Sequence, residues 1–376
     1  MQNLIKLLCV IGTRPEAIKM SPLINLLKGD NNFEVKVLTT GQHTDMLRQA
    51  LAFFNIKPDF DLNIMRERQS LDYITSSVLT GVGKYLDENN QDIILVHGDT
   101  STTFAAALAG FYRKIPVGHV EAGLRSKNIY LPFPEEINRV LADRIASLYF
   151  APTELEAENL KHEGTDPSKI FVTGNTVIDA LFWTLNNKLS VADGGVTRQI
   201  LELNSPLILM TAHRRESWGE PLVQICHAVK DIIKARPDVK FLIPLHKNPT
   251  VREVIYRELK DFNNNIIFTE PLDYPDFVAA MNKSIFILSD SGGIQEEASA
   301  LRKPVLIMRT LSERPQAVTL GTGVLVGTDR DKILEQALKI LNNKDYREYF
   351  LTRGMPFGDG TACLKIRDII LNYFKI

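Results

Sequence analysis

Short apolar runs alternate with longer amphipathic segments along most of the chain, and this alternation constrains the fold more than any other feature. Unbroken apolar runs are typical of strands buried on both faces, and the helical period of the intervening segments predicts helices. The predicted strands are Leu7–Ile11, Val35–Thr39, Ile93–His97, Val117–Glu121, Leu148–Ala151 and Ile170–Thr173, followed by Ile208–Thr211, Lys240–Pro244, Ile266–Phe268, Ile285–Ser289 and Val305–Met308. This order favours an α/β fold with parallel, doubly wound sheets.

The alternation restarts after a polar, glycine-containing stretch at 186–195, which divides the chain into two halves. The 376 residues suit two domains of roughly 100–200 residues each. We predict a Rossmann-like N-terminal domain at 1–185 and a Rossmann-like C-terminal domain at 196–361, and expect a helix at 362–376 to pack back on the first. Two such sheets facing a central cleft would bind ligands beyond the carboxyl ends of their strands.

Charge and cysteine content argue against several classes of protein. The 44 basic and 45 acidic residues leave a net charge of −1, so no global field attracts nucleic acid or an anionic membrane. The three cysteines form no Cys-x-x-Cys pair, which fits reduced cytoplasmic thiols better than disulfides or a cysteine-based zinc site. The apolar run Leu7–Ile11 is too short for a signal peptide, and no stretch reaches the ~18 apolar residues of a membrane span. We therefore expect a cytoplasmic protein that binds neither nucleic acid nor membrane.

Polar side chains follow several predicted strands of the first half. Arg14 opens a helix directly after the first strand, where its guanidinium and the helix N-terminus both favour an anion such as phosphate. Asp99 follows a further strand, Glu121 lies at the end of another, and Glu135 opens another helix. Each has a plainer interpretation alone, as a surface arginine, a helix N-cap at Asp99, or acids that stabilise a helix dipole. Carboxylates gathered at one sheet edge can raise the pKa of one another, which favours acid–base chemistry.

The second half supplies a histidine and a glycine turn at comparable positions. His213 follows a predicted strand and can contact a substrate phosphate or hydroxyl, although a lone histidine is more often structural. In the segment Ser291–Gly293, which links a strand to a helix, backbone N–H groups can cradle a diphosphate; a plain tight turn is the alternative. Glu297, one turn into that helix, can accept hydrogen bonds from ribose hydroxyls, and Arg314 can add positive charge. The first strand lacks a Gly-x-Gly-x-x-Gly fingerprint, so no conventional nicotinamide site is predicted.

Taken together and in order, these motifs resemble those of the non-hydrolysing UDP-N-acetylglucosamine 2-epimerases, a family with the GT-B fold. The resemblance runs through nearly the whole chain, and its joint pattern is far more specific than any single motif. The matching segments are Gly12-Thr13-Arg14-Pro15-Glu16, Gly41-Gln42-His43, His97-Gly98-Asp99-Thr100, His119-Val120-Glu121-Ala122-Gly123-Leu124-Arg125, Pro132-Phe133-Pro134-Glu135-Glu136, His213-Arg214-Arg215-Glu216 and Ser291-Gly292-Gly293-Ile294-Gln295-Glu296-Glu297.

The resemblance implies interconversion of UDP-GlcNAc and UDP-ManNAc with neither NAD nor a metal ion. It implies acid–base or charge-stabilising roles for Asp99, Glu121, Glu135 and His213, and places Arg14 and Lys19 near the phosphates or the sugar. It implies UDP binding by Ser291, Gly292, Gly293, Glu297 and Arg314, with Phe277 near the uracil. It further implies a homodimer that supplies precursors for bacterial surface polysaccharides.

The implied reaction is consistent with the chemistry of C2. The C2 proton of an N-acetylhexosamine has no adjacent carbonyl carbon to acidify it, so direct abstraction is costly. Expulsion of UDP from C1 builds oxocarbenium character, which makes that proton removable. The resemblance thus suggests anti elimination to 2-acetamidoglucal and UDP, followed by re-addition on the other face of C2. Preorganised donors must stabilise the departing UDP, and bases must reach both faces.

Many bacterial members of the family are activated by UDP-GlcNAc at a second site beside the catalytic one. The matching positions in this chain are Gln42, Arg68, Glu135, Arg214 and His246. The chain departs from the pattern at Asp45, where members with that site often carry Gln.

Other functions stay open from the sequence alone. A 2-epimerase of a modified UDP-sugar, such as a UDP-2,3-diacetamido hexuronate, would carry similar motifs. A GT-B glycosyltransferase would need an acceptor, and a hydrolysing 2-epimerase would release free ManNAc and UDP. A non-catalytic nucleotide-sugar sensor would bind without turnover, and the several carboxylates argue against it.

Overall fold

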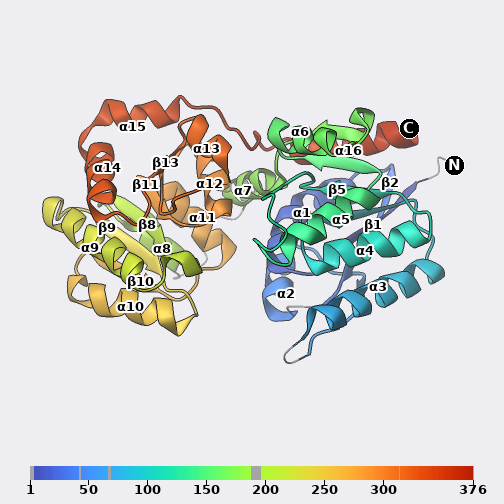
Figure 1. Ribbon diagram of the computed structural model, residues 1–376, viewed down its shortest axis with the longest axis horizontal. Coiled ribbons are helices and arrows are strands. Elements are labelled where there is room, and N and C mark those ends of the chain that lie inside the picture. Colours follow the sequence, from blue (N-terminus) through green and yellow to red (C-terminus); the bar gives the residue numbers. More distant parts are fainter. Residues whose placement is uncertain (1–3, 42–43, 67–68, 188–195, 313, 376) are drawn as a thin grey trace. The chain divides into compact units, whose positions relative to one another are not determined.

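The computed structural model describes residues 4–41, 44–66, 69–187, 196–312 and 314–375, and the chain divides into two compact units. The first unit comprises residues 1–180 and 358–376, and the second comprises residues 181–357. Each unit holds a parallel sheet with helices on both faces (Figure 1). The predicted α/β fold with two doubly wound parallel sheets is therefore confirmed.

The described part of the first unit contains a seven-stranded parallel sheet in the order β3-β2-β1-β4-β5-β6-β7. Its strands are β1 (Ile5–Ile11), β2 (Phe33–Thr39), β3 (Phe60–Asp61), β4 (Ile93–His97), β5 (Val117–Val120), β6 (Leu148–Ala151) and β7 (Ile170–Val172). Its helices are α1 (Arg14–Lys28), α2 (Thr44–Phe53), α3 (Leu71–Glu88), α4 (Ser101–Tyr112), α5 (Glu135–Ile145), α6 (Glu154–His162) and α16 (Ala362–Phe374), with a 3-10 turn at Pro167–Lys169. Helix α7 (Thr176–Asn187) begins in this unit and continues into the second.

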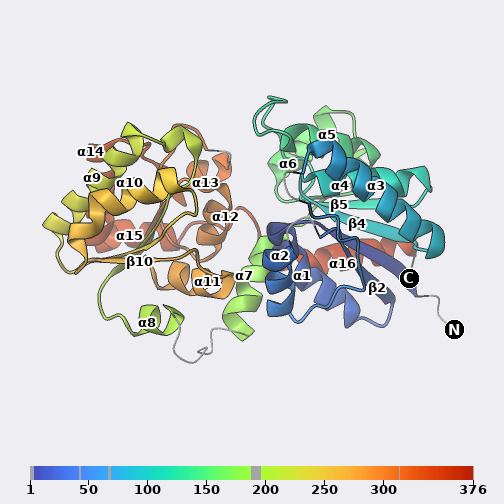
Figure 2. The ribbon, with the colours of Figure 1, turned by 90° about the horizontal axis from the view of Figure 1, so that it is seen from below.

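Two layers of helices cover the first sheet. Helices α3, α4 and α5 pack side by side on one face, and α2, α1 and α16 pack on the other (Figure 2). The core under α3 and α4 includes Val10 and Val96 from the sheet and Val78 from α3, all almost fully buried. The last helix therefore belongs to the first sheet although it follows the second unit in the chain. The N–H of Cys363 in its first turn donates to the Asp179 carboxylate at 2.9 Å and fixes this return.

The described part of the second unit contains a six-stranded parallel sheet in the order β10-β9-β8-β11-β12-β13. Its strands are β8 (Leu207–Thr211), β9 (Lys240–Pro244), β10 (Ile266–Thr269), β11 (Phe286–Ser289), β12 (Val305–Ile307) and β13 (Gly323–Leu325). Its helices are α8 (Val196–Glu202), α9 (Glu220–Ala235), α10 (Pro249–Leu259), α11 (Tyr274–Lys283), α12 (Gly292–Ala300), α13 (Pro315–Thr319), α14 (Arg330–Asn342) and α15 (Lys344–Leu351), with 3-10 turns at Arg215–Ser217 and Lys260–Phe262. Helices α10, α9 and α14 adjoin one another, and their core contains the fully buried Phe241 and Phe286.

The predicted strands all occur, and the differences lie at their ends. Glu121 falls outside β5 because its backbone turns to a φ of +66°, which no strand allows. The sequence analysis did not predict β3 and β13. These strands have only two and three residues, too few to form a recognisable apolar run. Of the predicted linker at 186–195, residues 188–195 lie outside the described part of the chain.

Gly123, in the loop after β5, lies against the backbone of α6. Gly123 has a φ of +88°, and a Cβ atom there would lie 2.3 Å from the carbonyl oxygen of Glu156. Gly164, with a φ of +85°, has no atom within 4 Å of the same position.

We predict that Gly164→Ala costs only the left-handed strain, about 1 kcal/mol, whereas Gly123→Ala adds a backbone clash and costs about 3 kcal/mol or more in total. Scanning calorimetry should show a melting temperature several degrees lower for Gly123→Ala than for Gly164→Ala. Equal melting temperatures would contradict the packing described here.

Candidate active site

The carboxyl ends of β1, β4 and β5 form one edge of the first sheet, where several predicted site residues come together. Strand β4 lies between β1 and β5 in this sheet. Gly12 follows β1 and approaches α4 so closely that a Cβ atom would lie 2.2 Å from Thr102 Oγ1. A larger residue would push the end of β1 away from α4.

A buried carboxylate, Glu16, holds these two segments together. It accepts the N–H groups of Gly12 at 2.9 Å and Thr13 at 2.6 Å. It also accepts the hydroxyls of Thr100 at 2.7 Å and Thr103 at 3.2 Å. Burial raises the pKa of Glu16, and these hydrogen bonds act in the opposite direction. The sequence does not single out Glu16, although it lies in one of the matching segments.

Glu121 is held in a single place by groups from three other segments. Its Oε1 accepts from Lys19 Nζ at 2.6 Å and from Asn175 Nδ2 at 2.7 Å, and its Oε2 lies 3.5 Å from His97 Nε2. Asn175 Oδ1 in turn accepts the N–H of Val177 at 3.0 Å, which orients the amide. Only 7% of the Glu121 side chain is exposed. A left-handed backbone at a buried, charged, non-glycine residue is typical of functional sites.

His97 contributes a neutral ring to this cluster. Burial lowers its pKa to about 3, with the neighbouring Glu121 charge acting in the opposite direction. Near neutral pH the ring therefore carries no charge, and Lys19 is the cation that balances Glu121.

Asp99 is more accessible, with 29% of its side chain exposed. Its carboxylate lies 3.0 Å from Arg139 Nη2, and its carbonyl accepts from Asn138 Nδ2 at 3.0 Å. Burial raises the pKa of Asp99; Arg139 opposes this and the Glu121 charge adds to it. The alternative of a helix N-cap at Asp99 is wrong, because the cap of α4 is Thr100, whose hydroxyl accepts the N–H of Thr103.

The two glutamates that open α5 have different surroundings. Glu135 is partly exposed and close enough to Asp99 for its charge to raise the pKa of that carboxyl. Glu136 is buried, accepts the N–H groups of Ser126 and Lys127 at 2.9 to 3.0 Å, and lies 3.5 Å from Arg139 Nε. Glu136 therefore holds the preceding loop, whereas Glu135 is the more exposed of the two glutamates.

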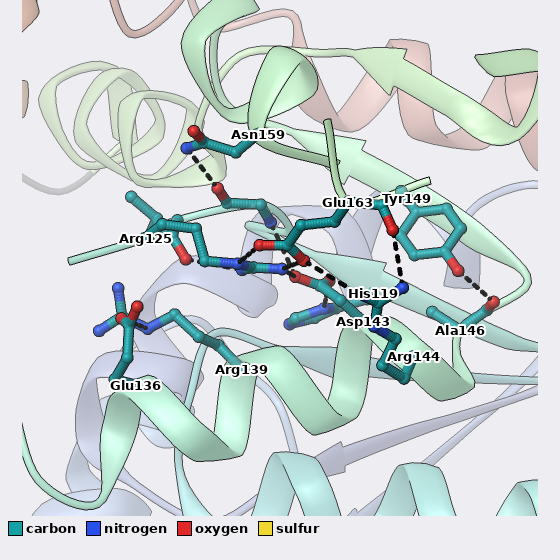
Figure 3. Close-up of polar contacts among 12 residues, drawn as sticks. His119, Arg125, Glu136, Arg139, Asp143, Arg144, Ala146, Tyr149, Asn159 and Glu163 are labelled. Carbon is teal, nitrogen blue, oxygen red and sulfur yellow. Dashed lines mark hydrogen bonds and ion pairs between the residues drawn. The ribbon is translucent and has the colours of Figure 1, made fainter. Parts of the chain in front are cut away.

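A network of charged side chains lies next to this edge of the sheet (Figure 3). Its members are His119, Asp143, Arg125 and Glu163. His119 Nδ1 lies 2.6 Å from Asp143 Oδ1, and Nε2 lies 2.7 Å from the Gly98 carbonyl. Burial acts to lower the pKa of His119, but Asp143 and the carbonyl outweigh it and the pKa is raised. Arg125 joins the network through Asp143 at 2.7 Å and Glu163 at 2.7 Å. Through Gly98, the network fixes the backbone directly before Asp99.

In the second unit, His213 lies just beyond the end of β8. Its Nδ1 is 2.9 Å from Oδ1 of the buried Asp290, and 37% of its side chain is exposed. The ring of His246 stacks beside it with a centroid distance of 6.1 Å. Burial and the neighbouring His213 lower the pKa of His246. Arg214 follows His213 and donates its backbone N–H to Asp290.

The predicted glycine turn lies at the start of α12. Ser291 is the N-cap residue, and Gly292 is the first residue of the helix. The N–H of Ser291 donates to Ser289 Oγ at 3.0 Å, and Ser289 Oγ lies 2.8 Å from Thr211 Oγ1 of β8. A Cβ atom on Gly293 would meet no atom within 4 Å, so open space adjoins this turn. The N-terminus of a helix beside open space suits an anion.

The other predicted residues of the second unit surround α12. Glu297 is buried and accepts from the Tyr274 hydroxyl at 2.9 Å. Burial and Glu297 raise the pKa of Tyr274. Phe277 lies one turn after Tyr274 on α11, and Arg314 pairs with Glu296 of α12.

The structure thus gathers Lys19, Asp99, Glu121 and Glu135 in the first unit. It places His213, Arg214 and His246 together in the second, and Ser291–Gly293, Glu297 and Arg314 on or beside α12. Arg14 is the first residue of α1, and Pro15 is the second. Gln42 and Arg68 lie outside the described residues. The sequence analysis does not name Asn175, Asp290 or Tyr274 as site residues. Asp290 directly follows β11 and Asn175 comes three residues after the end of β7, so the rule of polar residues beyond strand ends could have found both.

The described residues contain neither a metal-binding cluster nor a membrane-spanning helix. No group of three or more His, Cys, Asp or Glu side chains there is arranged to hold a metal ion. None of the described helices combines the length and apolar character required to cross a membrane.

Fold and site together define a two-domain α/β protein of GT-B type whose polar residues gather at the carboxyl ends of parallel strands. The family model of UDP-N-acetylglucosamine 2-epimerase matches residues 25–371. A UDP-N-acetylglucosamine 2-epimerase from Yersinia pestis is 48% identical over 372 residues, which cover 98% of this chain and 99% of that protein.

Solved structures of UDP-GlcNAc 2-epimerases also match nearly the whole chain. The UDP-GlcNAc 2-epimerase from Neisseria meningitidis, bound to UDP-GlcNAc, has a TM-score of 0.89 at 46% identity and covers 98% of this chain and 100% of that one. The enzyme from Methanocaldococcus jannaschii, in complex with UDP-GlcNAc and UDP, has a TM-score of 0.78 at 34% identity with the same coverage. The chain belongs to the UDP-N-acetylglucosamine 2-epimerase family.

We predict that Lys19→Met destabilises the first unit by about 3 kcal/mol or more, because it leaves the buried Glu121 charge without its cation. The double variant Lys19→Met/Glu121→Gln should recover part of this loss, since no unpaired charge remains. Thermal unfolding followed by circular dichroism measures both effects.

Lys161→Met is the matched control, because Lys161 forms an ion pair with Glu158 on the exposed face of α6. Surface pairs of this kind contribute little to stability. A Lys19→Met protein that melts with the Lys161→Met protein would contradict the buried-pair description.

Proposed function

We propose that the chain is a non-hydrolysing UDP-N-acetylglucosamine 2-epimerase, which reversibly converts UDP-GlcNAc to UDP-ManNAc. Membership of the family supports this, as do two relatives solved with UDP-GlcNAc. The observation that carries the proposal is the arrangement of Asp99, Glu121 and Lys19 at one sheet edge. Proton removal and return at C2 need acid–base groups held in fixed positions.

We propose anti elimination of UDP to 2-acetamidoglucal, followed by re-addition with the proton on the other face of C2. The second unit holds the UDP. Its Ser291–Gly293 turn offers N–H groups to the diphosphate, and open space at Gly293 supports this role. Glu297 binds the ribose, Arg314 adds positive charge, and Phe277 lies near the uracil.

In the first unit, Asp99 acts as a proton-exchanging group at C2. Its partial exposure lets it reach a ligand, and its raised pKa brings proton uptake closer to the working pH. Glu121 is instead bound by Lys19 and Asn175, which suits a residue that keeps its charge and holds Lys19 toward the sugar or phosphates. Glu135 and His213 supply further acid–base groups, and Arg14 binds phosphate at the start of α1.

We also propose activation by UDP-GlcNAc at a second site formed by Gln42, Arg68, Glu135, Arg214 and His246. The proximity of Arg214 and His246 to His213 supports a site that communicates with catalysis. Conversion of UDP-ManNAc at the full initial rate, with no UDP-GlcNAc present at the start, would refute this activation.

The same proposal extends to the cellular location, the oligomeric state and the use of the product. Three buried thiols suit a protein of the reducing cytoplasm, and the near-zero net charge suits one independent of nucleic acid and membrane. Membership of the family supports a homodimer. UDP-ManNAc made there would serve surface polysaccharide synthesis.

The proposed activity is tested by incubating the purified protein with UDP-GlcNAc alone, without NAD, added metal or acceptor. Anion-exchange chromatography should show UDP-ManNAc at equilibrium with UDP-GlcNAc and no accumulation of UDP. Free ManNAc with UDP would identify the hydrolysing reaction. Unchanged UDP-GlcNAc would contradict the proposal and lead to modified UDP-sugars, and then to acceptor screens for a glycosyltransferase.

We predict that Arg139→Gln moves the acidic limb of the pH profile of kcat/KM to higher pH. Arg139 opposes the raised pKa of Asp99, so its loss raises that pKa further. Because the ionised Asp99 is the base, activity falls as the pH drops through its pKa, and the limb should shift upward by about one unit.

Arg144→Gln is the control, since Arg144 lies on the same helix but interacts with Glu163 rather than Asp99. Its profile should match the wild type. A shift of equal size in both variants, or in neither, would contradict the role of Asp99.

A further inference from the structure

Asp290 is a buried carboxylate with two backbone N–H donors and one ring nitrogen around it, all from the segment that carries His213. Its Oδ2 accepts the backbone N–H groups of His213 and Arg214, both at 2.8 Å. Its Oδ1 lies 2.9 Å from His213 Nδ1, and none of its side chain is exposed. One side chain thus fixes both the backbone and the ring of His213.

Sheet register explains why these residues meet. Strands β8 and β11 are parallel neighbours, and Ser289 at the end of β11 pairs with Thr211 at the end of β8. Asp290 and His213 are therefore the first polar residues beyond two adjacent strand ends. A hydrogen bond of 2.8 Å between Thr211 Oγ1 and Ser289 Oγ also joins the last residues of the two strands. Their juxtaposition is built into the sheet.

The proton between them can be assigned from the donors and acceptors. Burial acts to raise the pKa of Asp290, but the hydrogen bonds from His213 and Arg214 outweigh it and the pKa is lowered. An ionised carboxylate only accepts hydrogen bonds, so the hydrogen on this contact belongs to His213 Nδ1. The 37% of the His213 side chain that is exposed leaves Nε2 as the nitrogen available to a ligand.

We propose that Asp290 is a positioning residue that fixes the Nδ1–H tautomer and the orientation of His213, so that Nε2 is the nitrogen presented to the substrate. The inference rests on the proposed epimerase function, in which His213 is an acid–base group. A carboxylate that orients a histidine in this way raises catalytic efficiency without touching the substrate.

The position of Asp290 gives the arrangement a second consequence. The residue directly precedes the Ser291–Gly293 turn, whose N–H groups we propose for the diphosphate. Asp290 therefore connects His213 to the turn: its carboxylate contacts the His213 ring, and its backbone leads directly into Ser291. The competing interpretation is that Asp290 only stabilises the two strand ends through the backbone N–H groups.

The variant Asp290→Asn separates these interpretations because it keeps the shape of the side chain. Its amide oxygen can still accept the backbone N–H groups, but its NH₂ group then faces Nδ1. The imidazole must accept there and carry its hydrogen on Nε2. We expect kcat to fall about a hundredfold, with KM for UDP-GlcNAc changed less than about threefold because the diphosphate turn is intact. Asp238→Asn, an exposed change in the same unit, should retain wild-type rates.

Double substitution distinguishes positioning from simple destabilisation. If Asp290 acts through His213, then Asp290→Asn should cost nothing further in a His213→Ala background. An equal loss in both backgrounds, or a single variant with wild-type kcat, would overturn the proposal.

A spectroscopic readout needs no variant to fold. Nitrogen-15 NMR of histidine-labelled wild-type protein, at a pH where the imidazole is neutral, should show His213 with its hydrogen on Nδ1. A hydrogen on Nε2 would overturn the assignment. Failure of the wild type to epimerise, with the hydrogen on Nδ1, would instead refute the proposed function and leave the Asp290 contact standing.

Discussion

The buried ion pair between Lys19 and Glu121 is the interaction on which the first unit's site depends. Glu121 turns out of β5 in a left-handed conformation and is 7% exposed, so its charge needs a partner within the protein. Lys19 from α1 and Asn175 from the segment after β7 provide it. These partners come from opposite sides of β5 in the sheet order, so the full set of contacts to Glu121 brings together the segments that follow β1, β5 and β7.

The two units share one arrangement of side chains at the carboxyl ends of their strands. In each unit a buried carboxylate just beyond a strand end accepts from fixed donors and lies against a second titratable side chain. In the first unit Glu121 holds Lys19, and in the second Asp290 holds His213. Asp99 differs from both, since its side chain is partly exposed and its pKa is raised. This difference between fixed charges and a partly exposed carboxyl with a raised pKa supports the proton-transfer role that we propose for Asp99.

Much of this organisation is predictable from the sequence because parallel strands buried on both faces leave unbroken apolar runs. The same rule points to Asp99, Glu121 and His213, since each follows such a run. The rule fails where the decisive contact is between distant segments. The adjacent Glu135 and Glu136 cannot be told apart until the loop at Ser126 is seen to donate to Glu136. Asp99 fits a helix cap as well as a site residue until Thr100 is seen to cap α4. The family itself was predicted from the order of motifs, and the comparisons confirmed it.

In the proposed reaction, fixed groups of this protein break and remake the C2–H bond of the sugar. The most direct test is proton NMR of the wild type with UDP-GlcNAc in deuterated buffer. We expect deuterium to appear at C2 as UDP-ManNAc forms. The C2 proton signal should be lost from both nucleotide sugars as equilibrium is reached. Formation of UDP-ManNAc with the original C2 proton fully retained would contradict exchange through a protein acid–base group.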